Sequence, residues 1–484
     1  MGKTCLAVDI GASSGRLILG ILSEDRIRIK EIYRFKNQMY KENNSYLWDV
    51  DHLFSEILTG LKKFGCLKLE AESIGVDTWA VDYVLLDKNG KKLGPVYAYR
   101  DNRTDNTMNE IIKSYSKEKI YEKTGIQFLQ FNTIYQLYEH LKLNKNIRDE
   151  VSSILMIPDY LNYLLSNKAA NEYTNATTTQ MYNINQNLWD KELLHLVGLK
   201  SFYFPIMIQP GTILGYLSKE IENEVGINKL KVIVPATHDT GSAVVSVPAT
   251  DNQFAYISSG TWSLMGIEND TPICSKEAMV CNFTNEGGAY NKIRVLKNVM
   301  GLWLIQEVKR LLKYAYSFSE LASLAEKAKI ISLINPNNSR FLNPVNMIEE
   351  IKTYCRETNQ TIPTTPGELA RCIFESLALQ YKQVLIQLRK ISGRTINKVH
   401  IVGGGSQNDY LNQLCADYTE CDVFAGPIEA TAIGNIMVQY ITLGEIDNLT
   451  EARKLINCSF NIKKFSPDLQ KNVEDKWNEF QKLL

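Results

Sequence analysis

Two hydrophobic segments, about half a chain apart, share one pattern of apolar and small residues. Residues 5–22 (CLAVDIGASSGRLILGIL) and residues 254–267 (FAYISSGTWSLMGI) each read as an apolar strand, a Ser-Ser-Gly turn and a second apolar strand. This pattern predicts a β-hairpin in each half. Small residues at the bend let backbone N–H groups and hydroxyls approach a phosphate closely. An ordinary hairpin explains either turn alone, but their recurrence favours a protein that binds a polyphosphate from both halves.

The rest of the first half continues with short apolar runs and one amphipathic segment. The period of the apolar residues predicts a helix near residues 51–64. Alternating or continuous apolar residues predict strands at 27–32, 73–76, 84–86 and 231–234. Mainly polar helical patterns with polar loops fill residues 100–200, and we interpret them as an insertion that helps to shape a substrate site.

The second half repeats this plan after its own hairpin. A helical stretch is expected near residues 298–313, and Thr365-Pro366-Gly367-Glu368 is a capping box with proline at the first helical position. A strand at 399–402 breaks into three glycines, and a helix begins near Asn408. Strands that alternate with helices after an opening meander predict two α/β domains that face one another across a cleft. We place the boundary near Pro248, which gives domains 1–247 and 248–484.

Composition and charge exclude several classes of protein. Hydrophobic residues make up 44% and charged residues 22% of the 484 residues, and the formal net charge is zero. We therefore expect neither nucleic acid nor a membrane surface as a partner. The nine cysteines are scattered without a C-x-x-C pair, and the strand pattern begins almost at once, which together favour the reducing cytoplasm. The oligomeric state, monomer or homodimer, is left open.

Several charged residues stand where α/β sheets bind ligands, at the ends of predicted strands. Asp239 follows the strand at 231–234, where it can accept a proton or cap the helix that follows. Arg16 can donate to phosphate or remain a solvated strand residue. Asp9 and Asp77 each end a strand and can hold Mg²⁺, although Asp77 can equally cap a turn.

The order of these segments resembles the FGGY carbohydrate kinases over nearly the whole chain. The segments that carry the resemblance are Asp9–Arg16, Asp77–Trp79, Tyr99–Asp101, Gly125–Phe128, Tyr173–Gln180, His238–Thr240, Ser258–Thr261, Asn285–Gly288, Asn298–Trp303 and Gly403–Gly405. The resemblance implies two actin-like, ribonuclease-H-like ATPase domains, the first binding sugar and phosphate and the second binding nucleotide. Within the family, the chain is most similar to members that phosphorylate L-rhamnulose at its 1-hydroxyl in L-rhamnose catabolism.

The resemblance also implies the cofactors ATP and Mg²⁺ and a role for each matching residue. Asp239 would be the catalytic base, and Asp9 and Asp77 would serve the metal. The residues expected to bind ATP are Ala12, Ser13, Ser14, Gly15, Arg16, Thr261, Gln306 and Gly404. The residues expected to bind the ketose are Ala80, His238, Thr240 and Asn298.

One departure and two alternatives limit this assignment. Ala80 stands where the family pattern has glycine, and its methyl group can change sugar preference by about 1–3 kcal/mol. The alternatives are a kinase for a related ketose such as L-fuculose and an actin-like ATPase without kinase activity. Such an ATPase needs no base for a sugar, so Asp239 with its flanking His238 and Thr240 favours the kinase.

Overall fold

The computed structural model describes residues 3–470 and 473–484 of the chain. Contacts between Cα atoms divide it into two compact units, each described here by itself. Unit 1 comprises the described residues of Met1–Ser246 together with Glu268–Val295 and Ala430–Ser459. Unit 2 comprises Val247–Ile267, Leu296–Glu429 and the described residues of Phe460–Leu484. A late segment of the chain is therefore part of the unit that the first half builds.

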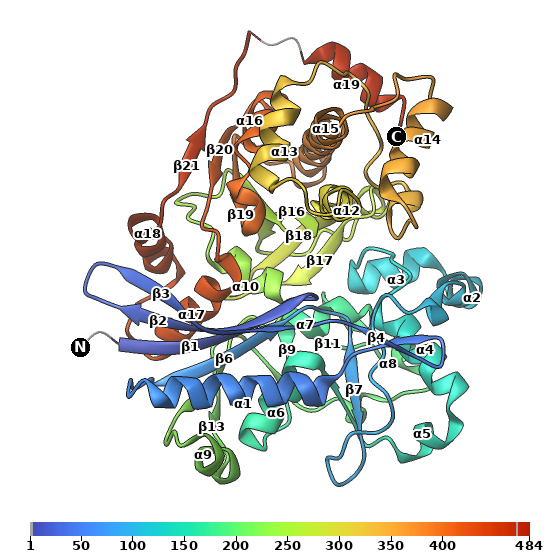
Figure 1. Cartoon of the computed structure of the whole chain (residues 1–484). Helices are drawn as coiled ribbons and strands as arrows, with labels where there is room; N and C mark the ends of the chain where they lie inside the picture. Colours follow the sequence, from blue (N-terminus) through green and yellow to red (C-terminus); the bar gives the residue numbers. More distant parts are fainter. Residues whose placement is uncertain (1–2, 471–472) are drawn as a thin grey trace. The chain divides into compact units, whose positions relative to one another are not determined.

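Unit 1 is built on a six-stranded sheet that contains the first predicted hairpin (Figure 1). Strands β1 and β2 pair antiparallel, with Asp9 opposite Arg16, while β1, β6 and β14 are parallel neighbours. These strands coincide with the apolar runs of the sequence, which confirms the strand predictions for this half. In spatial order the strands are β13 (Thr212–Tyr216), β14 (Lys231–Val234), β6 (Ser73–Thr78), β1 (Lys3–Ile10), β2 (Ser14–Leu22) and β3 (Ile27–Lys36).

Helices cover both faces of this sheet. Helix α1 (Val50–Cys66) packs one apolar face into the same core as Ile74 and Val76 of β6. Because side chains alternate along a strand, Gly75 and Asp77 point to the opposite face, where both contact Asn435 of α17 (Ala430–Thr442). The sheet thus lies between α1 and a helix from far along the chain.

The segment at 100–200 differs from its polar appearance in the sequence. Residues 171–184 are all buried, and β8 (Ser153–Met156) pairs antiparallel with β7 (Tyr83–Leu86). The expectation of mainly helical structure is confirmed, but these residues are not a polar surface, because the buried hydroxyls of Thr177, Thr178 and Thr179 donate to backbone carbonyls three residues earlier. The helices of this segment are α2 (Thr107–Ser114), α3 (Lys117–Thr124), α4 (Thr133–Leu143), α5 (Lys145–Glu150), α6 (Ile157–Ser166), α7 (Tyr173–Ala176) and α8 (Lys191–Leu196).

A seven-stranded sheet holds the second predicted hairpin, with Ser258 of β15 paired to Leu264 of β16. Strands β15 and β19 are parallel neighbours, with Ser258 opposite Val402. The spatial order is β17 (Thr284–Gly287), β18 (Ile293–Met300), β16 (Trp262–Asn269), β15 (Phe254–Ser259), β19 (Lys398–Val402), β20 (Asp422–Ala425) and β21 (Lys463–Phe465).

The helices of unit 2 confirm the start signals in the sequence, with one correction. Helix α15 (Pro366–Ser392) begins with the expected capping box, and Asn408 caps α16 (Asp409–Thr419). The helix expected near 298–313 begins only at Trp303, because residues 298–300 belong to β18. The other helices of this unit are α12 (Trp303–Leu311), α13 (Phe318–Lys327), α14 (Met347–Glu357) and α19 (Glu474–Gln481).

Candidate active site

Three carboxylates of unit 1 stand at the same edge of the first sheet. The parallel strands β1, β6 and β14 have their carboxyl ends there. Asp9 and Asp77 are register partners on β1 and β6, and Thr78 forms a β-bridge with His238, which follows β14. The structure therefore brings together Asp9, Asp77 and the turn that carries Asp239, at the edge where such sheets bind ligands.

The turn of the first hairpin is small and tightly packed. Ala12 and Ser13 are exposed at its tip, and Ser14 and Gly15 begin β2. A Cβ atom on Gly15 would lie 2.1 Å from the ring of Phe35, so no larger residue fits without moving that ring. This close packing fixes the backbone on one side and leaves the tip open to a ligand.

Arg16 does not extend freely into solvent. Its Nη2 lies 2.6 Å from Oδ2 of Asp9, and its side chain is only 18% exposed. A charge-assisted bond of this length holds the guanidinium over the sheet edge. Arg16 is thereby pre-positioned beside the turn that precedes it.

Asp77 is the most deeply buried of the three carboxylates. Its Oδ2 accepts a 2.6 Å hydrogen bond from Nδ2 of Asn435, whereas its Oδ1 has no hydrogen-bond partner within the described residues. Burial, followed by the negative charge of Asp9, raises the pKa of Asp77 well above its usual value, and Asp239 adds to this shift. Ionising all three carboxylates of this sheet edge therefore calls for an added positive charge.

A divalent cation would supply this positive charge. Within the described residues no three His, Cys, Asp or Glu side chains form a ready-made metal site. Mg²⁺, however, needs only one or two carboxylates because it keeps water and phosphate ligands. Asp77 has an oxygen without a hydrogen-bond partner within the described residues, and it lies next to the carboxylate of Asp9. These two carboxylates are the number that Mg²⁺ needs, so the predicted metal residues are compatible with this ion.

Asp239 is the first residue of helix α10 (Asp239–Val245), and its neighbour His238 occupies the N-cap position. The alternative that Asp239 is the N-cap is therefore wrong. Its Oδ1 accepts from the backbone N of Thr240 at 2.6 Å and lies 3.2 Å from Oγ1 of the same residue. The side chain is 31% exposed, so it remains accessible to a substrate hydroxyl.

A buried glutamate that the sequence analysis did not single out fixes the turn before Asp239. Oε2 of Glu172 accepts from the backbone N of Thr237 at 3.1 Å and from its Oγ1 at 2.6 Å. Oγ1 of Thr174 also donates to Oε2 of Glu172, at 2.6 Å. The carboxylate joins the helix at Tyr173 to the turn at Thr237, and it stands immediately before the segment 173–180 that resembled the family.

Trp79 and Ala80 lie beside a second buried carboxylate. The Trp79 ring packs against Trp48 at 4.3 Å between centroids, and both Nε1 atoms donate to Oδ2 of Asp82. Packing in the core is thus sufficient to explain Trp79. Ala80 is half-buried with ordinary backbone angles, whereas its neighbour Val81 has φ 68°. The strained position is one residue past the alanine.

The pH dependence of stability tests the burial of Asp82 in this cluster. Burial raises the pKa of Asp82 to about 6, although Gln136, Trp79 and Trp48 donate to the carboxylate and lower it. The pKa of Asp82 is higher in the folded state than in the unfolded state, where it is about 3.9, so the folded state binds this proton more tightly. The resulting stability is fully present below pH 4 and is lost as the pH rises to 6. Asp82→Asn should remove this part of the pH dependence, so the unfolding free energy of the variant relative to wild type rises by up to ~3 kcal/mol between pH 4 and 6.

Urea unfolding at half-unit pH intervals measures this difference. The matched control is Asp25→Asn, which removes an exposed carboxylate from the same unit. A difference between Asp82→Asn and wild type that stays constant from pH 4 to 7 would contradict the buried titration.

In unit 2, the second hairpin turn and the glycine turn after β19 lie at one sheet edge, since β15 and β19 are parallel. Oγ1 of Thr261 donates to Oε1 of Gln306 at 3.4 Å, and the backbone N of Trp303 donates to the carbonyl of Thr261. A Cβ on Gly404 would meet no atom within 4 Å, so open space lies beside this residue. Asn298 is on β18, half-buried.

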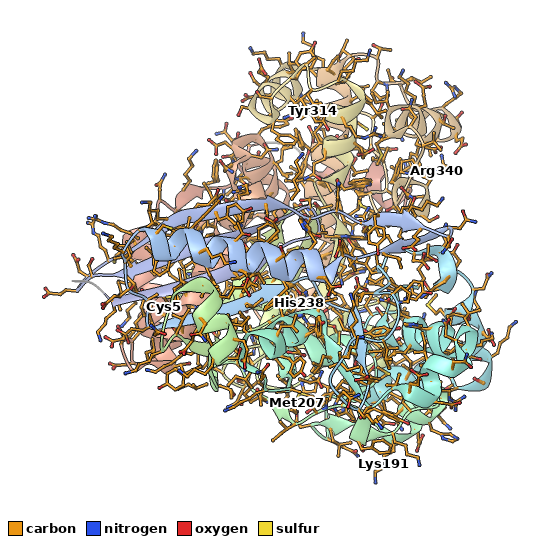
Figure 2. The ribbon with its side chains drawn as sticks, turned by 60° about the horizontal axis from the view of Figure 1, so that its bottom comes forward. Cys5, Lys191, Met207, His238, Tyr314 and Arg340 are labelled. Carbon is orange, nitrogen blue, oxygen red and sulfur yellow. The ribbon has the colours of Figure 1, made fainter. Side chains whose placement is uncertain are left out.

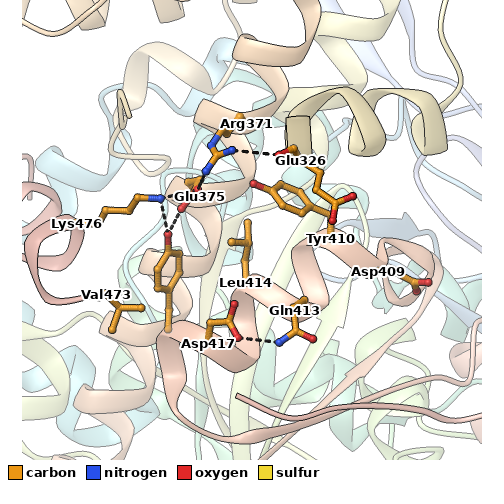
Figure 3. Close-up of a pocket in the computed structure, with 11 residues that line it drawn as sticks. Glu326, Arg371, Glu375, Asp409, Tyr410, Gln413, Leu414, Asp417, Val473 and Lys476 are labelled. Carbon is orange, nitrogen blue, oxygen red and sulfur yellow. Dashed lines mark hydrogen bonds and ion pairs between the residues drawn. The ribbon is translucent and has the colours of Figure 1, made fainter. Parts of the chain in front are cut away.

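A separate cavity of about 480 Å³ in unit 2 contains none of these residues (Figure 3). Its centre is the buried Glu375, whose Oε1 lies 2.7 Å from Nζ of Lys476 and 3.1 Å from Nη2 of Arg371. Tyr418 also donates to Glu375. These contacts balance the charge of Glu375 and tie α19 to α15, which gives the cluster a structural role.

The chain is similar to curated proteins over nearly its full length. A rhamnulokinase of Halalkalibacterium halodurans is 52% identical over 460 residues, which is 95% of this chain and 98% of the relative. A rhamnulokinase of Bacillus subtilis is 48% identical, over 95% of both chains. No described helix is both long enough and apolar enough to cross a membrane.

Solved structures confirm the actin-like, ribonuclease-H-like fold. A xylulose kinase from Rhodospirillum rubrum superimposes with a TM-score of 0.82 at 18% identity, covering 99% of this chain and 98% of its own. The Plasmodium falciparum glycerol kinase with ADP gives a TM-score of 0.80 at 16% identity, with the same coverage. Residues 4–246 match the N-terminal domain, and residues 255–443 the C-terminal domain, of the FGGY carbohydrate kinases. The chain belongs to the FGGY family of carbohydrate kinases.

Proposed function

We propose that the protein transfers the γ-phosphoryl group of ATP to the 1-hydroxyl of L-rhamnulose, giving L-rhamnulose 1-phosphate and ADP. The observation that carries the proposal is the 52% identity, over nearly the full length of both chains, to a rhamnulokinase. The cluster of Asp9, Arg16, Asp77 and Asp239 at one sheet edge supports it, because phosphoryl transfer needs charge neutralisation and a proton acceptor.

In this mechanism Asp239 accepts the proton of the attacking hydroxyl as the oxygen–phosphorus bond forms. His238, Thr240, Asn298 and the backbone at Ala80 bind the ketose. Residues of unit 1 from Ala12 to Arg16 bind the phosphates, and Thr261, Gln306 and Gly404 of unit 2 bind the nucleotide. Asp9 and Asp77 would hold Mg²⁺, which supplies positive charge to the phosphates. A sugar kinase of this kind works in the cytoplasm, where its ATP is made.

A coupled ADP-release assay over a panel of ketoses tests the proposal. We expect the highest kcat/KM with L-rhamnulose, lower values with L-fuculose and L-xylulose, and slow ADP release without sugar. A higher value with L-fuculose would replace the proposed substrate by a related ketose. ADP release that is unchanged by any ketose would instead support an ATPase without kinase activity.

Thr261→Ala tests the nucleotide assignment in unit 2. Loss of one hydrogen-bonding hydroxyl should raise the KM for ATP by up to about tenfold, since such a bond contributes about 0.5–1.5 kcal/mol. The KM for the ketose should stay within twofold. Thr364→Ala, an exposed threonine hydroxyl of the same unit, is the matched control. If only the ketose KM changed, Thr261 would not belong to the nucleotide site.

A further inference from the structure

A buried charged cluster contacts His238, the residue next to the base. Glu286 lies on β17 and Arg294 on β18, and both contact the imidazole of His238. Arg294 is completely buried, and His238, labelled in Figure 2, is 7% exposed. Neither Glu286 nor Arg294 has a role in the mechanism above.

The contacts at Nδ1 of His238 decide which ring nitrogen carries the proton. Nη2 of Arg294 lies 3.1 Å from Nδ1, and a guanidinium can only donate, so Nδ1 must accept. Glu286 competes for the same nitrogen, because its Oε2 lies 3.2 Å from Nδ1 and would require a proton there. This Oε2 has no hydrogen-bond partner within the described residues, so its alignment does not satisfy a bond from Nδ1.

Arg294 and Glu286 form a buried ion pair beside this nitrogen. Nη2 of Arg294 lies 3.1 Å from Oε2 of Glu286, and the pair is neutral as a whole. Burial opposes the charge on Glu286, but Arg294 holds the pKa of this carboxyl below its usual value. A buried arginine requires such a counter-charge, which Glu286 supplies.

We propose that Arg294 is a positioning residue that holds His238 as its neutral tautomer with the proton on Nε2, with Glu286 as the counter-charge of Arg294. Nε2 then faces Asp239, 3.5 Å from its Oδ1, and can donate to that oxygen or to a bound sugar hydroxyl. The proposal deepens the kinase function and rests on the proposed role of Asp239 as base.

This arrangement distinguishes the two oxygens of the base. Oδ1 of Asp239 receives the backbone N–H of Thr240, lies within reach of its hydroxyl and faces Nε2 of His238. All three contacts reach Oδ1. The oxygen that takes the proton from the ketose is therefore Oδ2.

The tautomer can be observed without any activity measurement. The chain has only five histidines, so selective ¹⁵N-histidine labelling gives few signals. His238→Gln assigns the signal of interest in long-range ¹H–¹⁵N spectra of the full-length protein. We expect a protonated Nε2 and an unprotonated Nδ1 at pH 7.5. A proton on Nδ1, alone or together with Nε2, would overturn the proposal.

Two variants separate the contributions of Arg294 and Glu286. Glu286→Gln should preserve the Nε2–H tautomer, because Arg294 still donates to Nδ1. Arg294→Gln should mix the tautomers and lower kcat by about 10–100-fold, the range found when a hydrogen-bond partner that orients a metal-binding histidine is lost, with the KM for ATP unchanged. Loss of the Nε2–H tautomer in Glu286→Gln would assign the orienting role to Glu286 instead.

A matched control removes another buried arginine of unit 1. Arg453 is 9% exposed, with Nη2 2.7 Å from Oε2 of Glu268. Arg453→Gln should lower stability without changing the His238 tautomer or the split between kcat and KM. If Arg294→Gln fails to fold, the wild-type and Glu286→Gln spectra still decide the proposal. A wild-type protein with no kinase activity on any ketose would refute the proposed function but leave the tautomer measurable.

Discussion

Asp239→Asn is expected to lower kcat by a factor of about 10²–10⁴, the usual contribution of a general base. The amide cannot accept the hydroxyl proton, yet it has nearly the shape of the carboxylate, and its Oδ1 can still accept from Thr240. Binding of ATP and ketose should therefore remain within a few-fold of wild type. Steady-state kinetics and isothermal calorimetry measure the two effects separately.

The control for this prediction removes a carboxylate elsewhere in unit 1. Asp270 is exposed and forms an ion pair with Lys292, so Asp270→Asn should leave kcat within twofold of wild type. A near-normal kcat for Asp239→Asn would remove Asp239 from the role of base. A loss of sugar binding without a loss of kcat would give it a binding role.

Gly434→Ala should give the largest loss of stability among single methyl additions in unit 1. Helices α10 and α17 cross here, and a Cβ on Gly434 would lie 1.8 Å from the backbone oxygen of Ser242. Because that oxygen cannot rotate away, the helices must separate, at a cost of about 1–3 kcal/mol or more. We expect a decrease in Tm of about 2–5 °C. The KM for the ketose should also rise, since α10 carries Asp239 at its first residue.

Gly65→Ala is the matched control for this substitution. Gly65 also lies within a helix, but its added Cβ would meet the nearest atom, the carbonyl oxygen of Val225, at an ordinary 3.4 Å. The gain in helix propensity should leave Tm unchanged or slightly higher. Equal Tm values for Gly434→Ala and wild type would show that the two helices can separate without cost.

The features that could be predicted from the sequence are those determined by residues close together in the chain. The two hairpins, the capping box at Thr365 and the strand that leads to Asp239 each depend on residues within a short window. The proximity of Asp9, Asp77 and the Asp239 turn was also accessible, because strand ends in a parallel sheet share one edge. The predicted helix wrongly included Asn298. The helical spacing of apolar residues that begins at Trp303 continues backward through Gly301, although residues up to Met300 belong to strand β18.

The features that the sequence missed depend on partners far along the chain. Glu172 is fixed by Thr237, and Glu286 by Arg294 together with His238, so the residues next to each carboxylate in the sequence do not show these partners. Buried charges are rare enough that a residue-by-residue interpretation assigns them to the surface. Only a fold that brings these segments together identifies their partners.

The place of residues 430–459 in unit 1 has a consequence for synthesis on the ribosome. The sheet face that carries Gly75 and Asp77 stays bare until α17 has been made, when most of the chain has already emerged. Domains that fold during translation usually do so as contiguous stretches, and long-range closure is slow. The N-terminal unit of this kinase must therefore await the synthesis of residues 430–459, and the sheet face that α17 covers is open to chaperones in the meantime.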